Sequence, residues 1–146
     1  MEQRLSVVTL GTDNLSAAKS FYENMLGWKP VAENNDIIFY QMNGFLLSIT
    51  SRTSLADFIG IPDEGSGFRG LTLSYNLKTE EEVRALYQEL TKKGVKILKE
   101  PTAPPFGGLF FYFADPDGNI LEVACNSFVL YGNKMNVIGH KSIEHL

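Results

Sequence analysis

The sequence predicts an α+β fold made of two successive modules, each with the order strand–helix–strand–strand–strand (βαβββ). One observation is that several short segments are rich in β-branched and apolar residues and end at turn-forming clusters. Another is that two longer segments carry apolar residues at helical spacing. The last is self-similarity: residues 8–10 correspond to 71–73, Tyr22 to Tyr87 and Gly27 to Gly94, with offsets of 63, 65 and 67 residues. A half of this size buries too little surface to be stable alone, so we expect the two modules to pack together.

The first module is expected over residues 4–51. Its helix is predicted at 15–26, where apolar residues recur at helical spacing between an Asp-Asn pair, which can cap the helix, and Gly27, which stops it. Its strands are predicted at 4–11, 28–33, 36–42 and 45–51. The Asn-Gly pair at 43–44 is the strongest short hairpin signal in the chain.

The second module is expected over residues 68–126 and repeats this order. Thr79 and Glu82 form a capping box at the start of its helix, and Gly94 ends that helix. Its strands are predicted at 68–76, 95–99, 108–114 and 119–126. The Asp-Pro-Asp-Gly sequence at 115–118 suits a type I turn between the last two strands.

These modules define one expected domain over residues 1–127, with a linker at 52–67 between them. The linker is expected because it contains Pro62, Gly65 and Gly67. A C-terminal tail remains at 128–146, and its scattered apolar side chains could close a dimer or dock on another protein.

Composition limits the classes of partner. The chain has 13 Lys and Arg against 17 Asp and Glu, a formal net charge of −4, with no basic run, so we expect no nucleic-acid binding. No apolar stretch approaches the length of a membrane span, so we expect no membrane partner. The N-terminus lacks the order of a signal peptide, and Cys125 is the only cysteine, so a cytoplasmic protein without an internal disulfide is expected.

Three motifs resemble the glyoxalase, bleomycin-resistance and extradiol-dioxygenase superfamily, also called vicinal oxygen chelate proteins. They are VVTLGTDNLSAAKSFYENMLGWK, RGLTLSYNLKTEEEV and GGLFFYFADPDGNILEVA, within about residues 4–127. The resemblance implies a glyoxalase-like fold in which the sheets of paired βαβββ modules curl around a cavity, often completed in a dimer. We therefore expect a homodimer.

In metal-using members of this superfamily, four strands each contribute one His or Glu to a divalent cation. Those places fall on Val7, Ser48, Gly70 and Glu122, and only Glu122 is a suitable ligand. A stable site needs at least three good donors, so we expect no metal and no other cofactor.

The same places predict which side chains line the cavity, because alternate residues of a strand share one face. The predicted ligand pocket consists of Val7, Thr9, Phe39, Gln41, Ser48, Thr50, Gly70, Thr72, Ser74, Phe106, Phe110, Tyr112 and Glu122. Several of these are small, so there is room for a ligand, and the aromatic residues suit an organic molecule. Phe106 lies in a loop rich in proline and glycine that could act as a lid or as a passive connector.

Glu122 is the candidate catalytic residue, because it is the one ionisable group within an apolar strand. We expect its carboxylate to face inward, where it could orient an amine or hydroxyl of a ligand or act as a general base. Two alternatives stay open: a side chain facing solvent, and a structural hydrogen bond to Thr9 or Thr72.

The sequence therefore favours a metal-free, glyoxalase-like protein that binds a small organic molecule, such as one that sequesters a drug or metabolite. Whether it is an enzyme stays open. The alternative is a lyase, isomerase or dioxygenase of the same superfamily that uses a metal or uses Glu122 as a base.

Overall fold

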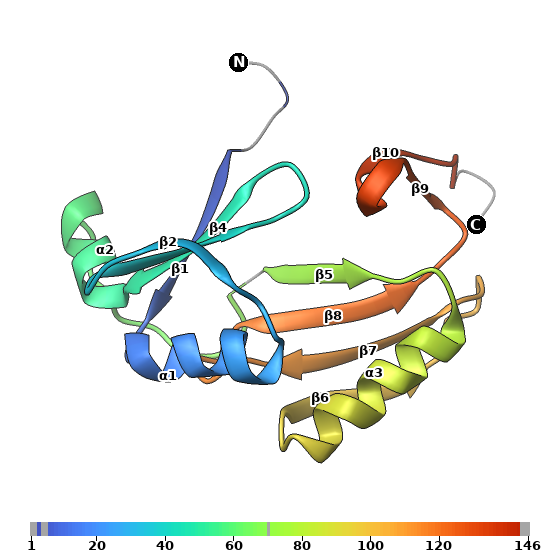
Figure 1. Ribbon diagram of the computed structural model, residues 1–146, viewed down its shortest axis with the longest axis horizontal. Helices are drawn as coiled ribbons and strands as arrows, with labels where there is room; N and C mark the ends of the chain where they lie inside the picture. Colours follow the sequence, from blue (N-terminus) through green and yellow to red (C-terminus); the bar gives the residue numbers. More distant parts are fainter. Residues whose placement is uncertain (1–2, 4–5, 70, 144–146) are drawn as a thin grey trace. The chain divides into compact units, whose positions relative to one another are not determined.

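The computed structural model describes residues 3, 6–69 and 71–143. The chain divides into two compact units, Met1–Gly67 and Phe68–Leu146. Each unit contains a four-stranded open sheet with a helix against it, which confirms the predicted α+β class (Figure 1). None of the described helices is long and apolar enough to cross a bilayer.

The sheet of the first unit has the strand order β1-β4-β3-β2. Its strands are β1 (Val7–Thr12), β2 (Pro30–Glu33), β3 (Ile37–Gln41) and β4 (Leu46–Ser51). β1 runs parallel to β4, and the other pairings are antiparallel. The strand positions agree with the prediction to within a few residues at their ends.

Helix α1 (Leu15–Ser20) begins at Asn14, whose side-chain oxygen accepts a hydrogen bond from the Ala17 amide at 2.9 Å. The helix continues as a π-helical turn, Phe21–Met25. Its apolar side packs on the sheet, and the buried residues of this layer are Leu10, Ala18, Phe21, Tyr22, Ile38, Tyr40, Leu47 and Ile49.

The segment expected as a linker contains a helix, α2 (Arg52–Ile59). The Ser51 side chain caps its first turn by accepting from the Ser54 amide, and Gly60 ends it with φ of +86°. Only Ala56 of this helix is buried, although Leu55, Phe58 and Ile59 recur at helical spacing, a signal that the linker prediction did not use.

The second unit repeats the topology, with the strand order β5-β8-β7-β6. Its elements are β5 (Thr72–Asn76), α3 (Glu80–Lys92), β6 (Lys96–Thr102), β7 (Leu109–Ala114) and β8 (Ile120–Cys125). The predicted capping box is present, because Thr79 accepts from the Glu82 amide and Glu82 accepts from the Thr79 amide. The predicted tight turn is also present, with the Gly118 amide donating to the Asp115 carbonyl at 3.1 Å. The repeat seen in the sequence is therefore a repeat of structure.

The two faces of this second sheet differ. Helix α3 covers one face, and the residues buried there include Val83, Leu90, Phe111, Phe113, Leu121 and Val123. The opposite face, which we call the open face, carries the intervening residues of β5, β7 and β8.

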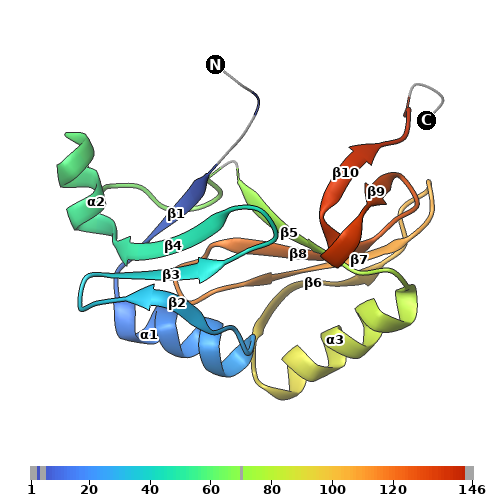
Figure 2. The same ribbon diagram turned by 45° about the horizontal axis from the view of Figure 1, so that its top comes forward.

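The C-terminal segment expected as a tail folds into a hairpin of β9 (Val129–Tyr131) and β10 (Val137–His140), joined through a single 3-10 turn, Asn133–Met135 (Figure 2). The Asn76 side chain at the end of β5 donates to the Tyr131 hydroxyl at 2.6 Å. This bond ties the hairpin to the edge strand of the second sheet.

Candidate functional site

One row of side chains crosses the open face of the second sheet from edge to edge. In the strand register, Ser74 lies opposite Glu122, Glu122 opposite Tyr112, and Tyr112 opposite Lys99. Opposing residues on one face of a sheet lie close enough for their side chains to interact. The row therefore brings a hydroxyl, a carboxylate, a phenol and an ammonium group together.

Glu122 is half-buried, and the Ser74 hydroxyl donates to its Oε2 at 3.3 Å. Thr72, one of the expected structural partners, is not the one that the structure shows. Thr72 lies opposite Ile120 in the parallel ladder, so the residue level with Glu122 is Ser74. A carboxylate can accept about four hydrogen bonds, so acceptor capacity remains for a ligand.

Tyr112 stands beside this carboxylate. Burial raises the pKa of the Tyr112 hydroxyl, and the negative charge of Glu122 and a hydrogen bond to it raise the pKa further. The phenol therefore stays protonated at neutral pH and is a hydrogen-bond donor. Phe110 lies next to Tyr112 on the same face, with ring centroids 5.6 Å apart in an edge-on arrangement.

In the corresponding row of the first unit, the polar side chains form hydrogen bonds with each other. The Thr9 and Ser48 hydroxyls are 2.7 Å apart, and Ser48 is only 1% exposed. Phe39 lies opposite Ser48 and is half-buried, whereas Val7 at the start of β1 is exposed. This row therefore presents mainly an apolar surface to a ligand, because its hydroxyl groups bond to each other.

Two predicted pocket residues of the first unit support turns. The Thr50 hydroxyl donates to the Asp36 carbonyl at 2.8 Å. The Gln41 amide donates to the Met42 carbonyl at 2.8 Å and to the Phe45 carbonyl at 3.3 Å. These bonds hold the ends of the β2–β3 and β3–β4 hairpins.

The remaining predicted pocket residues belong to the second unit. Thr72 is exposed at the start of β5. Phe106 is about half exposed and packs edge-on against Phe128, with centroids 6.1 Å apart, so its observed contact is with the base of the C-terminal hairpin. Gly70 lies outside the described residues.

The family's metal places do not fit a cation. Val7 and Gly70 carry no donor atom in their side chains, and the Ser48 hydroxyl is bonded to Thr9. Over the described ranges, no group of three or more His, Cys, Asp or Glu side chains is arranged to hold a metal ion. Glu122 is thus the one carboxylate at these four places.

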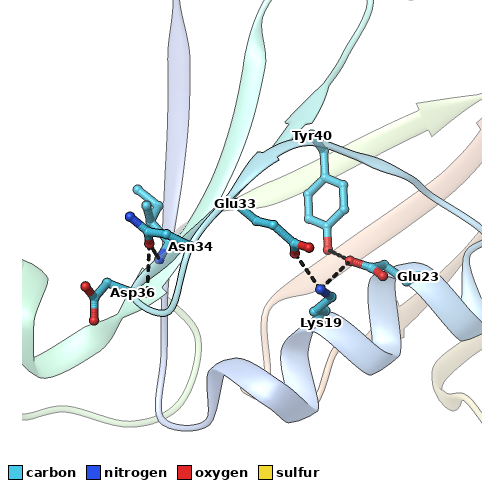
Figure 3. Close-up of polar contacts among 7 residues, drawn as sticks. Lys19, Glu23, Glu33, Asn34, Asp36 and Tyr40 are labelled. Carbon is cyan, nitrogen blue, oxygen red and sulfur yellow. Dashed lines mark hydrogen bonds and ion pairs between the residues drawn. The ribbon is translucent and has the colours of Figure 1, made fainter.

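A separate groove of about 450 Å³ lies on the helix side of the first unit. Figure 3 shows Lys19 between Glu33 and Glu23, with the Tyr40 hydroxyl donating to Glu23 at 3.3 Å. The Asn34 side chain accepts from the amides that begin β3. The groove is lined by Leu15, Ser16, Lys19, Glu33, Asn34, Asn35 and Ile38. The Lys19–Glu33 pair joins α1 to β2, and the Tyr40–Glu23 bond joins β3 to the π-helical turn.

The topology is that of a known class of proteins. The model of the Glyoxalase/Bleomycin resistance protein/Dioxygenase superfamily matches residues 4–123. The chain belongs to this superfamily, which confirms the resemblance seen in the motifs.

Individual relatives agree with this assignment. A glyoxalase-related enzyme from Fulvimarina pelagi is 39% identical, with a TM-score of 0.84 over 95% of this chain and 99% of that one. A glyoxalase/bleomycin resistance protein/dioxygenase from Nocardioides is 18% identical, with a TM-score of 0.76 over 97% and 91% of the two chains. The metallothiol transferase FosB of Lysinibacillus sphaericus (strain C3-41) is 23% identical over 120 residues, which are 82% of this chain and 80% of the relative.

Proposed function

We propose that the protein binds a small organic molecule on the open face of the second sheet, without a metal. The observation that carries this proposal is the half-buried Glu122 carboxylate between Ser74 and Tyr112. No neighbouring side chain in the row is a His, Cys, Asp or Glu that could hold a metal with it. Glu122 accepts a hydrogen bond from a hydroxyl or amine of the ligand. Phe110 and Tyr112 provide the aromatic surface on which its apolar body packs.

Physical chemistry supports this role for Glu122. A hydrogen bond to an ionised group contributes more than one between neutral groups, and partial burial strengthens it further. Aromatic side chains with a few convergent polar groups are typical of small-molecule sites. A protein that only binds in this way would sequester its ligand, as in resistance to a drug or toxic metabolite.

The test uses phenols as probes, because a phenol combines an aromatic ring with a single hydrogen-bond donor. Titrating para-hydroxybenzyl alcohol, para-hydroxybenzoate and tyramine into the protein in the presence of a chelator should shift NMR amide signals of β7 and β8. Glu122→Gln keeps the shape and the partner Ser74 but removes the charge, so it should weaken phenol binding about tenfold.

Glu64→Gln is the matched control, because Glu64 is an exposed carboxylate in the other unit and should leave the affinity unchanged. Equal binding by the wild-type protein and Glu122→Gln would contradict the proposed role of Glu122. Loss of binding on adding the chelator would contradict the metal-free site.

A second candidate function is an enzyme in which Glu122 is a general base and Tyr112 a proton donor. Its support is the adjacency of these groups in the β7–β8 ladder, together with the 39% identity to a protein described as a glyoxalase-related enzyme. A proton-abstracting enzyme would exchange an acidic C–H proton of its bound substrate with deuterated solvent, and Glu122→Gln would abolish that exchange. Pure sequestration predicts no exchange in either protein.

The wider proposal includes a small organic ligand as the partner, a homodimeric assembly and a cytoplasmic location, with no nucleic-acid or membrane partner. The net charge of −4 without a basic run supports the exclusion of nucleic acid.

A further inference from the structure

Strand β6 is irregular where it passes the open face. Ile97 lies opposite Phe113 and Lys99 opposite Tyr112, so two steps along β6 correspond to one step along β7. Leu98 is the extra residue, and it is 45% exposed. Such a bulge moves the side chains that follow it to the other face of the sheet, here as far as a second register shift between Lys99 and Thr102. Bulges are frequent beside functional sites.

The bulge decides where Lys99 points. With regular alternation, Lys99 would share the face of Ile97, towards α3, and Leu98 would enter the row with Tyr112. Instead the Lys99 ammonium lies 5.9 Å from the centroid of the Phe110 ring, which is on the open face. A cation therefore stands at the end of the row where an apolar side chain is otherwise expected.

The Lys99 ammonium is available to a ligand. In the part of the chain that the structure describes, no carboxylate forms an ion pair with Lys99, and the residue is exposed. Its contact with Phe110 is near the distance limit of a cation–π interaction and is weak at an exposed site. Lys99 is two strands away from Glu122, which is roughly 10 Å at the usual strand spacing.

We infer that the ligand is an aromatic organic acid, held by a hydrogen-bond donor at Glu122 and by its acidic group at Lys99. This rests on the proposed function of the open face and specifies the class of ligand. The row then matches such a molecule along its length: an acceptor at Glu122, aromatic surface at Tyr112 and Phe110, and a cation at Lys99. Lys99 is thus the residue that determines specificity for an acid over a neutral or cationic phenol.

The experiment compares phenols that differ only in the group opposite the hydroxyl. In NMR titrations, para-hydroxybenzoate should bind about fivefold more tightly than para-hydroxybenzyl alcohol, as expected for one exposed ion pair. Lys99→Gln should remove this preference while leaving the affinity for the alcohol unchanged. Lys99→Glu should reverse it, so that tyramine binds more tightly than para-hydroxybenzoate.

Lys92→Gln is the control, because Lys92 is an exposed lysine on α3, the helix that covers the opposite face. Lys92→Gln should keep the wild-type preference for para-hydroxybenzoate over para-hydroxybenzyl alcohol. One outcome separates the two proposals: all three phenols bind and Glu122→Gln weakens their binding, but the acid and the alcohol bind equally well. In that case the inference about Lys99 is wrong and the proposed function stands. If no phenol perturbs the amides of β6, β7 or β8, both are wrong.

Discussion

Glu122 and Tyr112 occupy one register pair of the β7–β8 ladder, and each changes what the other can do. The carboxylate is a hydrogen-bond acceptor, and its charge opposes ionisation of the phenol. Ser74 adds a donor from the other side of the carboxylate. The pair therefore places a hydrogen-bond acceptor beside a protonated phenol, which is a suitable arrangement for a ligand that both donates and accepts.

This coupling predicts an alkaline titration that depends on Glu122. Burial and the Glu122 charge raise the pKa of Tyr112 above its ordinary value of about 10. The folded state thus holds this proton more tightly than the unfolded state. The stability that it contributes is complete below about pH 10 and is lost as the pH rises through the folded pKa.

Glu122→Gln should lower the Tyr112 pKa towards the ordinary value, with the part due to burial remaining. Tyrosinate absorbance against pH measures this change, and Tyr112→Phe identifies the signal. Tyr40 is an internal reference, because burial raises its pKa and its neighbour is Glu23 in the other unit. A Tyr112 pKa that stays the same in Glu122→Gln would contradict the coupling.

At the scale of elements, the β6–β7 connection is constrained by one close approach. Gly108 has φ of +91°, and a Cβ atom at this position would lie 2.2 Å from the Cys125 carbonyl oxygen. The neighbouring Gly107 also has a positive φ, of +87°, but a Cβ there would meet nothing within 4 Å. A substitution at Gly107 therefore tests backbone strain alone, whereas one at Gly108 tests backbone strain together with steric overlap.

Gly108→Ala should therefore destabilise the protein more than Gly107→Ala. Gly107→Ala pays only for a left-handed backbone, about 1 kcal/mol. Gly108→Ala adds a clash with β8, and we expect a total loss of about 3 kcal/mol or more. Urea unfolding of the two variants measures the difference in the free energy of unfolding. Equal losses in the free energy of unfolding would contradict this prediction, because β7 and β8 would then accommodate the added Cβ atom at Gly108 without cost.

At the scale of the whole molecule, large apolar side chains are exposed on both units. Phe58 is 94% exposed, Phe68 71% and Ile138 69%, and they come from α2, the start of the second unit and β10. These side chains are the apolar surface that is available for association with another chain. The resemblance of the sequence motifs to the superfamily also implies a dimer.

We therefore expect the purified protein to be a homodimer at micromolar concentration. Light scattering coupled to size-exclusion chromatography should give twice the mass of one chain, and dilution should reveal the dissociation constant. A chain ending at Asn126 tests the contribution of the C-terminal hairpin to this assembly. A single-chain mass at every concentration of the full-length protein would contradict the expectation.

The sequence by itself was sufficient for the features that depend on local periodicity. Alternation with a period of two places Ser74, Tyr112 and Glu122 on the face of the sheet opposite α3. Capping chemistry locates the start of α3 at Thr79, and the repeated pattern gives the same strand order in both sheets. The residues at the family's metal places can also be read directly, since a side chain without a donor atom does not depend on the fold.

Tertiary structure alone decided which residues meet. Register between strands distant in sequence selected Ser74, and not Thr72, as the partner of Glu122. The bulge at Leu98 moved Lys99 onto the open face, although its parity predicts the other face. Asn76 and Tyr131 were brought together across 55 positions. The physical reason is that alternation is a property of one strand, whereas register and bulges are set by hydrogen bonding and packing between strands.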